Sequence, residues 1–157
     1  MKALGASANV NLYYVWLRGE MYPKVVGKDR AEDLSPVGSL VREGVPTTFH
    51  SDYPVAPPKP LLGVTLGLTR VGQTGTKTLG SGERINLEQA LRMITIDAAY
   101  VLGLDNKVGS IEPGKLADFT VLEQDPHNVK PAAIRNIPVW GTVVGGRVFP
   151  ASEISNR

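Results

Sequence analysis

Four prolines between Tyr53 and Leu61 constrain this sequence more than any other feature. Each proline removes a backbone donor and pushes the residue before it into an extended conformation, so the stretch YPVAPPKPL is expected to be a rigid loop. The preceding residues, VPTTFHSD, are rich in β-branched and aromatic side chains and predict a strand over 45–52. The strand therefore runs directly into the loop, and its last residues include a polar pair, His50 and Asp52.

The segments before this strand predict a parallel α/β arrangement. Alternating apolar residues in the opening segment predict a strand over 3–14, and the polar stretch 18–34 predicts a loop. SPVGSLVREG predicts a short helix with Ser35 as its cap and Gly44 at its end. A strand, a helix and a strand form the repeating unit of a parallel α/β fold, which is the architecture we expect here.

A longer helix is predicted from Leu87 to Leu102, because apolar residues recur there at intervals of three and four. Asn86 is placed to cap its first turn, and Gln89 to complete a reciprocal capping box. The glycine-rich stretch 72–82 lacks the G-x-x-x-x-G-K-[ST] spacing of a phosphate-binding loop. We therefore expect a surface loop followed by a helix that packs on a core.

Short β segments follow this helix and predict a small all-β unit. LADFTVLE has the composition of a strand, and VWGTVVGGRVF that of a hairpin that turns at Gly145 and Gly146. The change in texture lies near residue 108. We therefore expect two parts, 1–107 with the α/β units and 108–157 with about three or four strands.

The composition and charge of the chain exclude several functions. Of its 157 residues, 17 are Lys or Arg and 15 are Asp or Glu, and the net charge of +2 is scattered with no basic run. Nucleic acid is therefore not an expected partner. Cysteine is absent, which excludes disulfides and thiolate chemistry and fits a reducing, cytoplasmic location. The most apolar stretch, PLLGVTLGLTRVG, is too short and too broken by glycine to span a membrane, and the N-terminus turns polar too early for a secretory signal.

His50 and Asp52 allow two interpretations. On a strand, residues two apart share a face, and the carboxyl end of a parallel strand is where α/β folds place metal ligands and proton carriers. Alternatively, Asp52 caps the proline-rich turn and His50 is a satisfied residue at a strand end. A zinc site needs three or four ligands. His127 lies in a turn and is expected to be exposed, and no spacing selects Asp97 or Asp118 as further ligands.

Three motifs, in this order, resemble a known family: SPVGSLVREGVPTTFHSDYPVAPPKPL, INLEQALRMITIDAAYVLGLDNKVGSIEPGKLADFTVLEQDP and IPVWGTVVGGRVF. Together they resemble the C-terminal portion of the amidohydrolase superfamily, in the branch of YtcJ-like metal-dependent hydrolases (amidohydrolase family 3). The resemblance runs from Ala3 to Phe149. It implies an α/β fold in which 1–107 is the last part of a (β/α)8 barrel and 108–157 is a small β-sandwich segment.

The resemblance also implies roles for particular residues. Asp52 matches the aspartate that ends the last barrel strand, binds the catalytic metal and carries the proton of the attacking water. His50 lines the same site. Tyr13, Tyr14 and Trp16, at the end of the first predicted strand, are candidates for substrate contact, although such aromatic side chains more often serve as rim packing. The implied reaction is hydrolysis of a non-peptide carbon–nitrogen bond, amide or cyclic amide, in a small-molecule substrate, with a divalent metal, zinc by expectation, as cofactor.

The chain also departs from the family. Such enzymes carry an H-x-H pair on their first barrel strand, and this sequence contains no H-x-H. The last two barrel strands alone are expected here, so the chain resembles either a portion of a longer enzyme or a truncated relative. No metal and no activity are then expected of this chain in isolation, and a homo-oligomer or the remainder of a longer chain is its expected partner. The alternative hypothesis is a non-catalytic α+β module that acts through protein interaction.

Overall fold

The computed structural model describes residues 1–76 and 78–151. Its first part is built around two parallel strands, β1 (Ala8–Val10) and β2 (Thr47–Phe49), in which Ala8 pairs with Thr47 and Val10 with Phe49. Between them lie four short helices: α1 (Tyr13–Arg18), α2 (Tyr22–Val26), α3 (Lys28–Glu32) and α4 (Val37–Arg42). A 3-10 turn, η1 (Lys2–Leu4), precedes β1. The predicted parallel α/β unit is confirmed, with both strands shorter than expected.

The first strand ends early because Asn11 turns the chain. The Oδ1 atom of Asn11 accepts a hydrogen bond from the backbone N–H of Tyr13 at 3.0 Å, and α1 begins at that tyrosine. The prediction of a strand as far as residue 14 is therefore wrong. The prediction of a loop over 18–34 is also wrong, because α2 and α3 occupy most of that stretch.

The helix predicted before β2 is confirmed as α4, but its start differs from the prediction. Pro36 occupies the capping position and no side chain caps the helix. Ser35 has a φ of 53° and its Oγ donates instead to the carbonyl of Asn11 at 2.8 Å. Gly44, with a φ of 67°, follows the helix as expected. The serine therefore contacts the first strand, which local sequence patterns do not reveal.

After the proline-rich loop, α5 (Pro60–Thr69) crosses the core. Pro60 suits the first helical turn, where its missing N–H has no intrahelical partner. A Cβ at Gly63 would lie 2.2 Å from Cε2 of Phe49, so glycine permits the close approach of α5 to β2. The helix lies in the main hydrophobic core, which includes Leu12, Leu62, Val64, Leu66 and Met93.

The long helix expected from Leu87 to Leu102 is broken into α6 (Leu87–Met93) and α7 (Ile96–Val101). The capping box of Asn86 and Gln89 is confirmed, with both hydrogen bonds at 2.9 Å. The break has a tertiary cause. Thr48, buried in β2, donates its hydroxyl to the carbonyl of Met93 at 2.6 Å, which provides a partner for a carbonyl at the helix end.

The stretch 72–82, of which residue 77 lies outside the described residues, is not wholly a surface loop. Residues 73–76 are exposed, whereas Leu79 and Gly80 are buried. The stretch leads into the 3-10 turn η2 (Ser81–Glu83). The expectation of a simple surface loop is therefore only partly confirmed.

The second part contains a three-stranded antiparallel sheet in the order β3 (Phe119–Leu122), β4 (Val139–Val144) and β5 (Arg147–Pro150). The predicted hairpin turn is confirmed at Gly145 and Gly146, whose φ angles are 55° and 79°. Two further 3-10 turns, η3 (Pro126–Asn128) and η4 (Pro131–Asn136), join β3 to β4.

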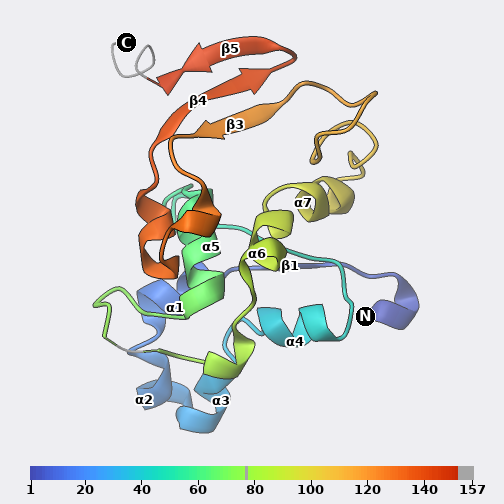
Figure 1. Ribbon diagram of the computed structural model, residues 1–157. Helices are drawn as coiled ribbons and strands as arrows, with labels where there is room; N and C mark the ends of the chain where they lie inside the picture. Colours follow the sequence, from blue (N-terminus) through green and yellow to red (C-terminus); the bar gives the residue numbers. More distant parts are fainter. Residues whose placement is uncertain (77, 152–157) are drawn as a thin grey trace.

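Figure 1 shows the three-stranded sheet at one end of the molecule, away from α1 to α4. The turn η4 packs on α5, where the backbone N–H of Arg135 donates to Oγ1 of Thr65 at 3.0 Å. Within the described part of the chain, no helix is long and apolar enough to cross a membrane. Residues 152–157 of the predicted second part lie outside the described residues.

Candidate active site

A pocket of about 330 Å³ lies at the carboxyl end of β2. His50 and Ser51, which follow the strand, line one side of it. Tyr13 from α1, Lys59 from the proline-rich loop and Met93 from α6 line the rest, together with their neighbours. The backbone N–H of His50 continues the strand pairing by donating to the carbonyl of Val10 at 3.2 Å. The pocket therefore lies where parallel α/β folds place their sites.

Asp52 lies next to this pocket, in the turn that begins the proline-rich loop. It has a φ of 54°, and its carbonyl accepts a hydrogen bond from the N–H of Val55 at 2.8 Å. Its side chain is exposed and makes no hydrogen bond or ion pair within 1–76 and 78–151. Because β2 ends at Phe49, strand geometry does not align Asp52 with His50. The carboxylate and the imidazole come from the same strand end, and the imidazole alone lines the pocket.

The aromatic residues of α1 differ from the sequence prediction in their positions. Tyr14 and Trp16 lie on the helix rather than at a strand end, and Trp16 packs against the main core with its indole N–H buried and without a partner among the described residues. Neither lines the pocket.

Of the three aromatic candidates that the sequence offered, Tyr13 is the one that lines the pocket. Its hydroxyl donates to the carbonyl of Lys59 at 2.6 Å, and burial raises the pKa of its phenol above the ordinary value of 10.0. In the sequence, Asn11 was the one indication that a helix begins here, because an asparagine side chain can accept from the backbone N–H two residues ahead. That reading would have shifted Tyr13 from a strand to the first turn of a helix.

The described residues do not form a complete metal site. Within that part of the chain, no group of three or more His, Asp or Glu side chains is arranged to hold a metal ion. Asp97 pairs with Arg92 at 2.7 Å, and Asp118 accepts from the N–H of Gly145 at 2.6 Å. The expected exposure of His127 is confirmed. The two carboxylates that the sequence left open as extra ligands therefore have other partners.

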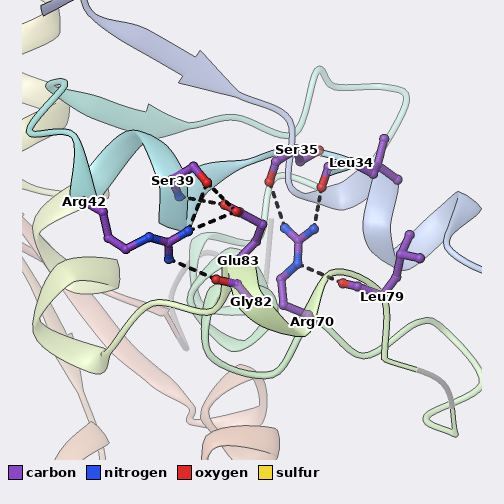
Figure 2. Close-up of polar contacts among 8 residues, drawn as sticks. All are labelled: Leu34, Ser35, Ser39, Arg42, Arg70, Leu79, Gly82 and Glu83. Carbon is purple, nitrogen blue, oxygen red and sulfur yellow. Dashed lines mark hydrogen bonds and ion pairs between the residues drawn. The ribbon is translucent and has the colours of Figure 1, made fainter. Parts of the chain in front are cut away.

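Hydrogen bonds and an ion pair made by Arg42 and Arg70 join separate segments of the α/β part (Figure 2). Glu83 accepts from the N–H and the hydroxyl of Ser39 at 2.7 and 2.5 Å, and from Arg42 at 3.2 Å. Burial alone would raise the pKa of Glu83, but these hydrogen bonds and the charge of Arg42 outweigh it and lower the pKa. Arg70 is fully buried, and desolvation lowers its pKa to about 10 against the opposing charges of Glu83 and Glu32.

The two parallel strands and the pocket at the carboxyl end of β2 define an α/β protein with a candidate site at a strand end. The model of the amidohydrolase family matches residues 1–150. The chain therefore belongs to the amidohydrolase family. The resemblance found in the three sequence motifs is confirmed.

Individual relatives are much longer than this chain. An N-substituted formamide deformylase from Arthrobacter pascens is 32% identical over 140 residues, which is 88% of this chain and 25% of that protein. A putative amidohydrolase, YtcJ, from Bacillus subtilis is 28% identical over 125 residues, 78% of this chain and 24% of that protein. An uncharacterized metal-dependent hydrolase from Pyrococcus horikoshii superposes with a TM-score of 0.70 at 25% identity, over 83% of this chain and 26% of that one. The chain spans about a quarter of the length of these relatives.

Proposed function

We propose that this chain is the C-terminal portion of a hydrolase that cleaves a non-peptide carbon–nitrogen bond, amide or cyclic amide, in a small-molecule substrate. The observation that carries the proposal is the position of Asp52, directly beyond the carboxyl end of β2 in a chain of the amidohydrolase family. A relative whose name describes deformylation of N-substituted formamides supports a carbon–nitrogen bond as the point of attack. The division into a barrel portion, 1–107, and a β-sandwich segment, 108–157, is part of this proposal.

Asp52 is proposed as a metal ligand and as the general acid/base. Its exposed carboxylate has no partner among the described residues, so it is free to bind a cation and to exchange a proton. It would accept a proton from the attacking water and return it to the leaving nitrogen. Asp52 would help to hold a divalent ion, zinc in this proposal, and such an ion would lower the pKa of a bound water in the complete enzyme. The remaining ligands would come from the remainder of a longer chain or from a partner chain.

His50 is proposed to contact substrate, because it lines the pocket beside Asp52. Tyr14 and Trp16 remain proposals that the pocket does not support directly, since neither lines it. Tyr13 is better placed to contact a bound molecule, although its hydroxyl already donates to Lys59. A substrate would therefore meet an imidazole on one side and an aromatic ring on the other.

The second candidate function is a non-catalytic module that acts through protein interaction. It is favoured by the lack of a three-ligand group within 1–76 and 78–151. The two proposals differ in whether Asp52 binds a metal ion when the remaining ligands are present.

Elemental analysis of the purified chain tests the first proposal with a single substitution, Asp52→Asn. Asparagine tolerates the positive φ of this position as well as aspartate does, so the variant removes the charge without straining the turn. Asp33→Asn, at an exposed position, is the matched control. About one divalent ion per chain, lost in Asp52→Asn and kept in the control, is the expected result for a metal site that uses Asp52. Equal metal in all three proteins would contradict its role as a ligand. No metal in any of them would mean that this chain alone does not assemble the site, a result expected of a portion of a longer hydrolase as well as of the non-catalytic module.

A further inference from the structure

We propose that a chain of hydrogen bonds running from Arg70 to Tyr13 fixes the wall of the pocket that His50 lines. Arg70 and Ser35 are then positioning residues, because they touch the pocket only through other residues. The inference rests on the proposed function where it treats this pocket as the substrate site. The hydrogen bonds themselves do not depend on that assignment.

The chain begins at the buried guanidinium of Arg70. Its Nη1 donates to the carbonyl of Ser35 at 2.9 Å, its Nη2 to the carbonyl of Leu34, and its Nε to the carbonyl of Leu79 at 3.0 Å. Figure 2 shows the three carbonyls arranged around the one side chain. A planar fork of donors fixes the direction of each carbonyl, which a lysine ammonium would not do. The backbone at residues 34 and 35 is therefore held in place by α5, at whose end Arg70 lies.

Ser35 transmits this constraint to the end of β1. Its positive φ, 53°, directs the chain so that its Oγ donates to the carbonyl of Asn11 at 2.8 Å. The side chain of Asn11 in turn accepts from the N–H of Tyr13 at 3.0 Å. Since an N–H can only donate, the amide oxygen of Asn11 must face Tyr13, which fixes the orientation of that amide. The start of α1 is thereby set by contacts that begin at Arg70.

Tyr13 is the last residue in this series of hydrogen bonds, and it lines the pocket itself. Its hydroxyl donates to the carbonyl of Lys59 at 2.6 Å, and both residues line the pocket. The next residue, Pro60, begins α5, and α5 ends at Thr69, next to Arg70. The hydrogen bonds and the helix therefore form a closed ring, in which loss of one link releases the pocket wall. A site whose supporting contacts are rigid holds a substrate in one geometry, and small displacements of such contacts weaken catalysis.

Two substitutions at Ser35 cut the ring at one link. Arg70 contacts the carbonyl of Ser35 and not its side chain, so Ser35→Ala and Ser35→Gly both keep that contact and lose only the hydrogen bond to Asn11. Glycine also relieves the positive φ, so an effect common to both variants belongs to the lost hydroxyl. Ser39→Ala is the matched control, because Ser39 lies on the neighbouring α4 and binds Glu83 rather than the ring.

The readouts are the titration of the Tyr13 phenol, followed by NMR with labelled tyrosine, and the chemical shift of the His50 ring. The signals are assigned with Tyr13→Phe and with His127→Gln, which removes the other of the two histidines. In both Ser35 variants we expect the pKa of Tyr13 to fall toward its ordinary value and the His50 signal to move, with neither change in Ser39→Ala. Arg70→Lys is expected to move both signals in the same direction.

Unchanged signals in the two Ser35 variants would overturn the inference, as would an equal change in Ser39→Ala, which would indicate general loosening. If Arg70→Lys does not fold, the Ser35 variants decide the result. None of these readouts requires metal or substrate. The ring can therefore fail while the role of Asp52 stands, and the role of Asp52 can fail while the ring stands.

Discussion

The α/β part and the three-stranded sheet differ in how they are held together. In the first, α5 is surrounded by apolar side chains, with Val64 fully buried, and the fork of Arg70 is fully buried as well. In the second, Trp140 is 45% exposed and Val148 54% exposed. The register places Val148 opposite Val143 on one face and Phe149 opposite Thr142 on the other, so both faces carry exposed apolar side chains.

The difference lies in how much apolar surface each part leaves exposed. An antiparallel sheet usually packs one face on a core and leaves a polar face to water. The sheet β3 to β5 departs from this pattern, because exposed apolar side chains lie on both of its faces. The two parts share the main core, because Ile134 and Ile137 from the η4 segment are buried in it together with the side chains of α5. The outer part of the sheet instead carries exposed apolar side chains.

The largest effect is expected from Arg70→Met. The substitution removes the donor from the carbonyls of Leu34 and Leu79, and one of two donors from the carbonyl of Ser35, which also accepts from the N–H of Val37 at 2.8 Å. Each carbonyl left unpaired inside the protein costs free energy. We expect the free energy of unfolding to fall by about 3 kcal/mol or more. Urea denaturation measures it, and Arg30→Met, at an exposed position, is the control. A loss below 1 kcal/mol would show that water takes the place of the guanidinium as donor to these carbonyls. It would contradict the view that water is excluded from the region around Arg70.

A matched pair of valines tests the comparison directly. Val64→Ala removes buried methyl groups from α5 and should lower the free energy of unfolding by about 2 kcal/mol. Val148→Ala makes the same change on the exposed sheet and should alter it by no more than about 0.5 kcal/mol. Thermal and urea denaturation of both variants give the two values. Similar losses at the two positions would mean that the sheet is covered in solution, for instance by a second copy of the chain.

A smaller effect, about 1–2 kcal/mol, is expected from Glu83→Gln at pH 7, because a charged acceptor of three donors is replaced by a neutral amide. The folded pKa of Glu83 is below its ordinary value of 4.5. Its contribution is therefore present above the unfolded pKa and lost as the pH falls through the folded pKa. The wild type and the variant should approach each other in stability below pH 4.5, as measured by urea denaturation across that range. A difference that stays constant in acid would contradict a role for the charge.

The smallest effect concerns His127, which joins two elements on the surface. Its Nε2 lies 2.6 Å from Glu88 on α6 and its Nδ1 lies 2.8 Å from Asp125. The hydrogen bonds that the ring donates to these carboxylates, chiefly the one to Glu88, raise the pKa of His127 above its ordinary value of 6.5. Any stabilisation is then present below pH 6.5 and lost as the pH rises through the raised pKa. An NMR titration should show the pKa of His127 falling in Glu88→Gln, and an unchanged titration would show that the contact does not persist in solution.

Much of the fold was predictable because it depends on neighbours in the sequence. The capping box of Asn86 and Gln89, the hairpin at Gly145 and Gly146 and the short helix before Gly44 all follow from local rules, and all are confirmed. For the candidate site, the sequence indicated the strand end that carries His50. It named Tyr13 as one of three aromatic candidates but placed it at a strand end. The turn at Asn11 puts Tyr13 at the start of α1 instead, and the partner of its hydroxyl lies 46 residues away.

The remaining features were decided by contacts between distant segments. The helix after Asn86 breaks because Thr48 of β2 provides a partner for the carbonyl of Met93, and periodicity within the helix contains no sign of it. Ser35, a plausible cap by local rules, is drawn instead to Asn11. The sequence by itself determined the parallel α/β unit, the antiparallel hairpin and the family, because these depend on local composition and motif order. Only the tertiary structure decided where each element ends and which side chains meet, because buried polar groups must find partners wherever the fold brings them.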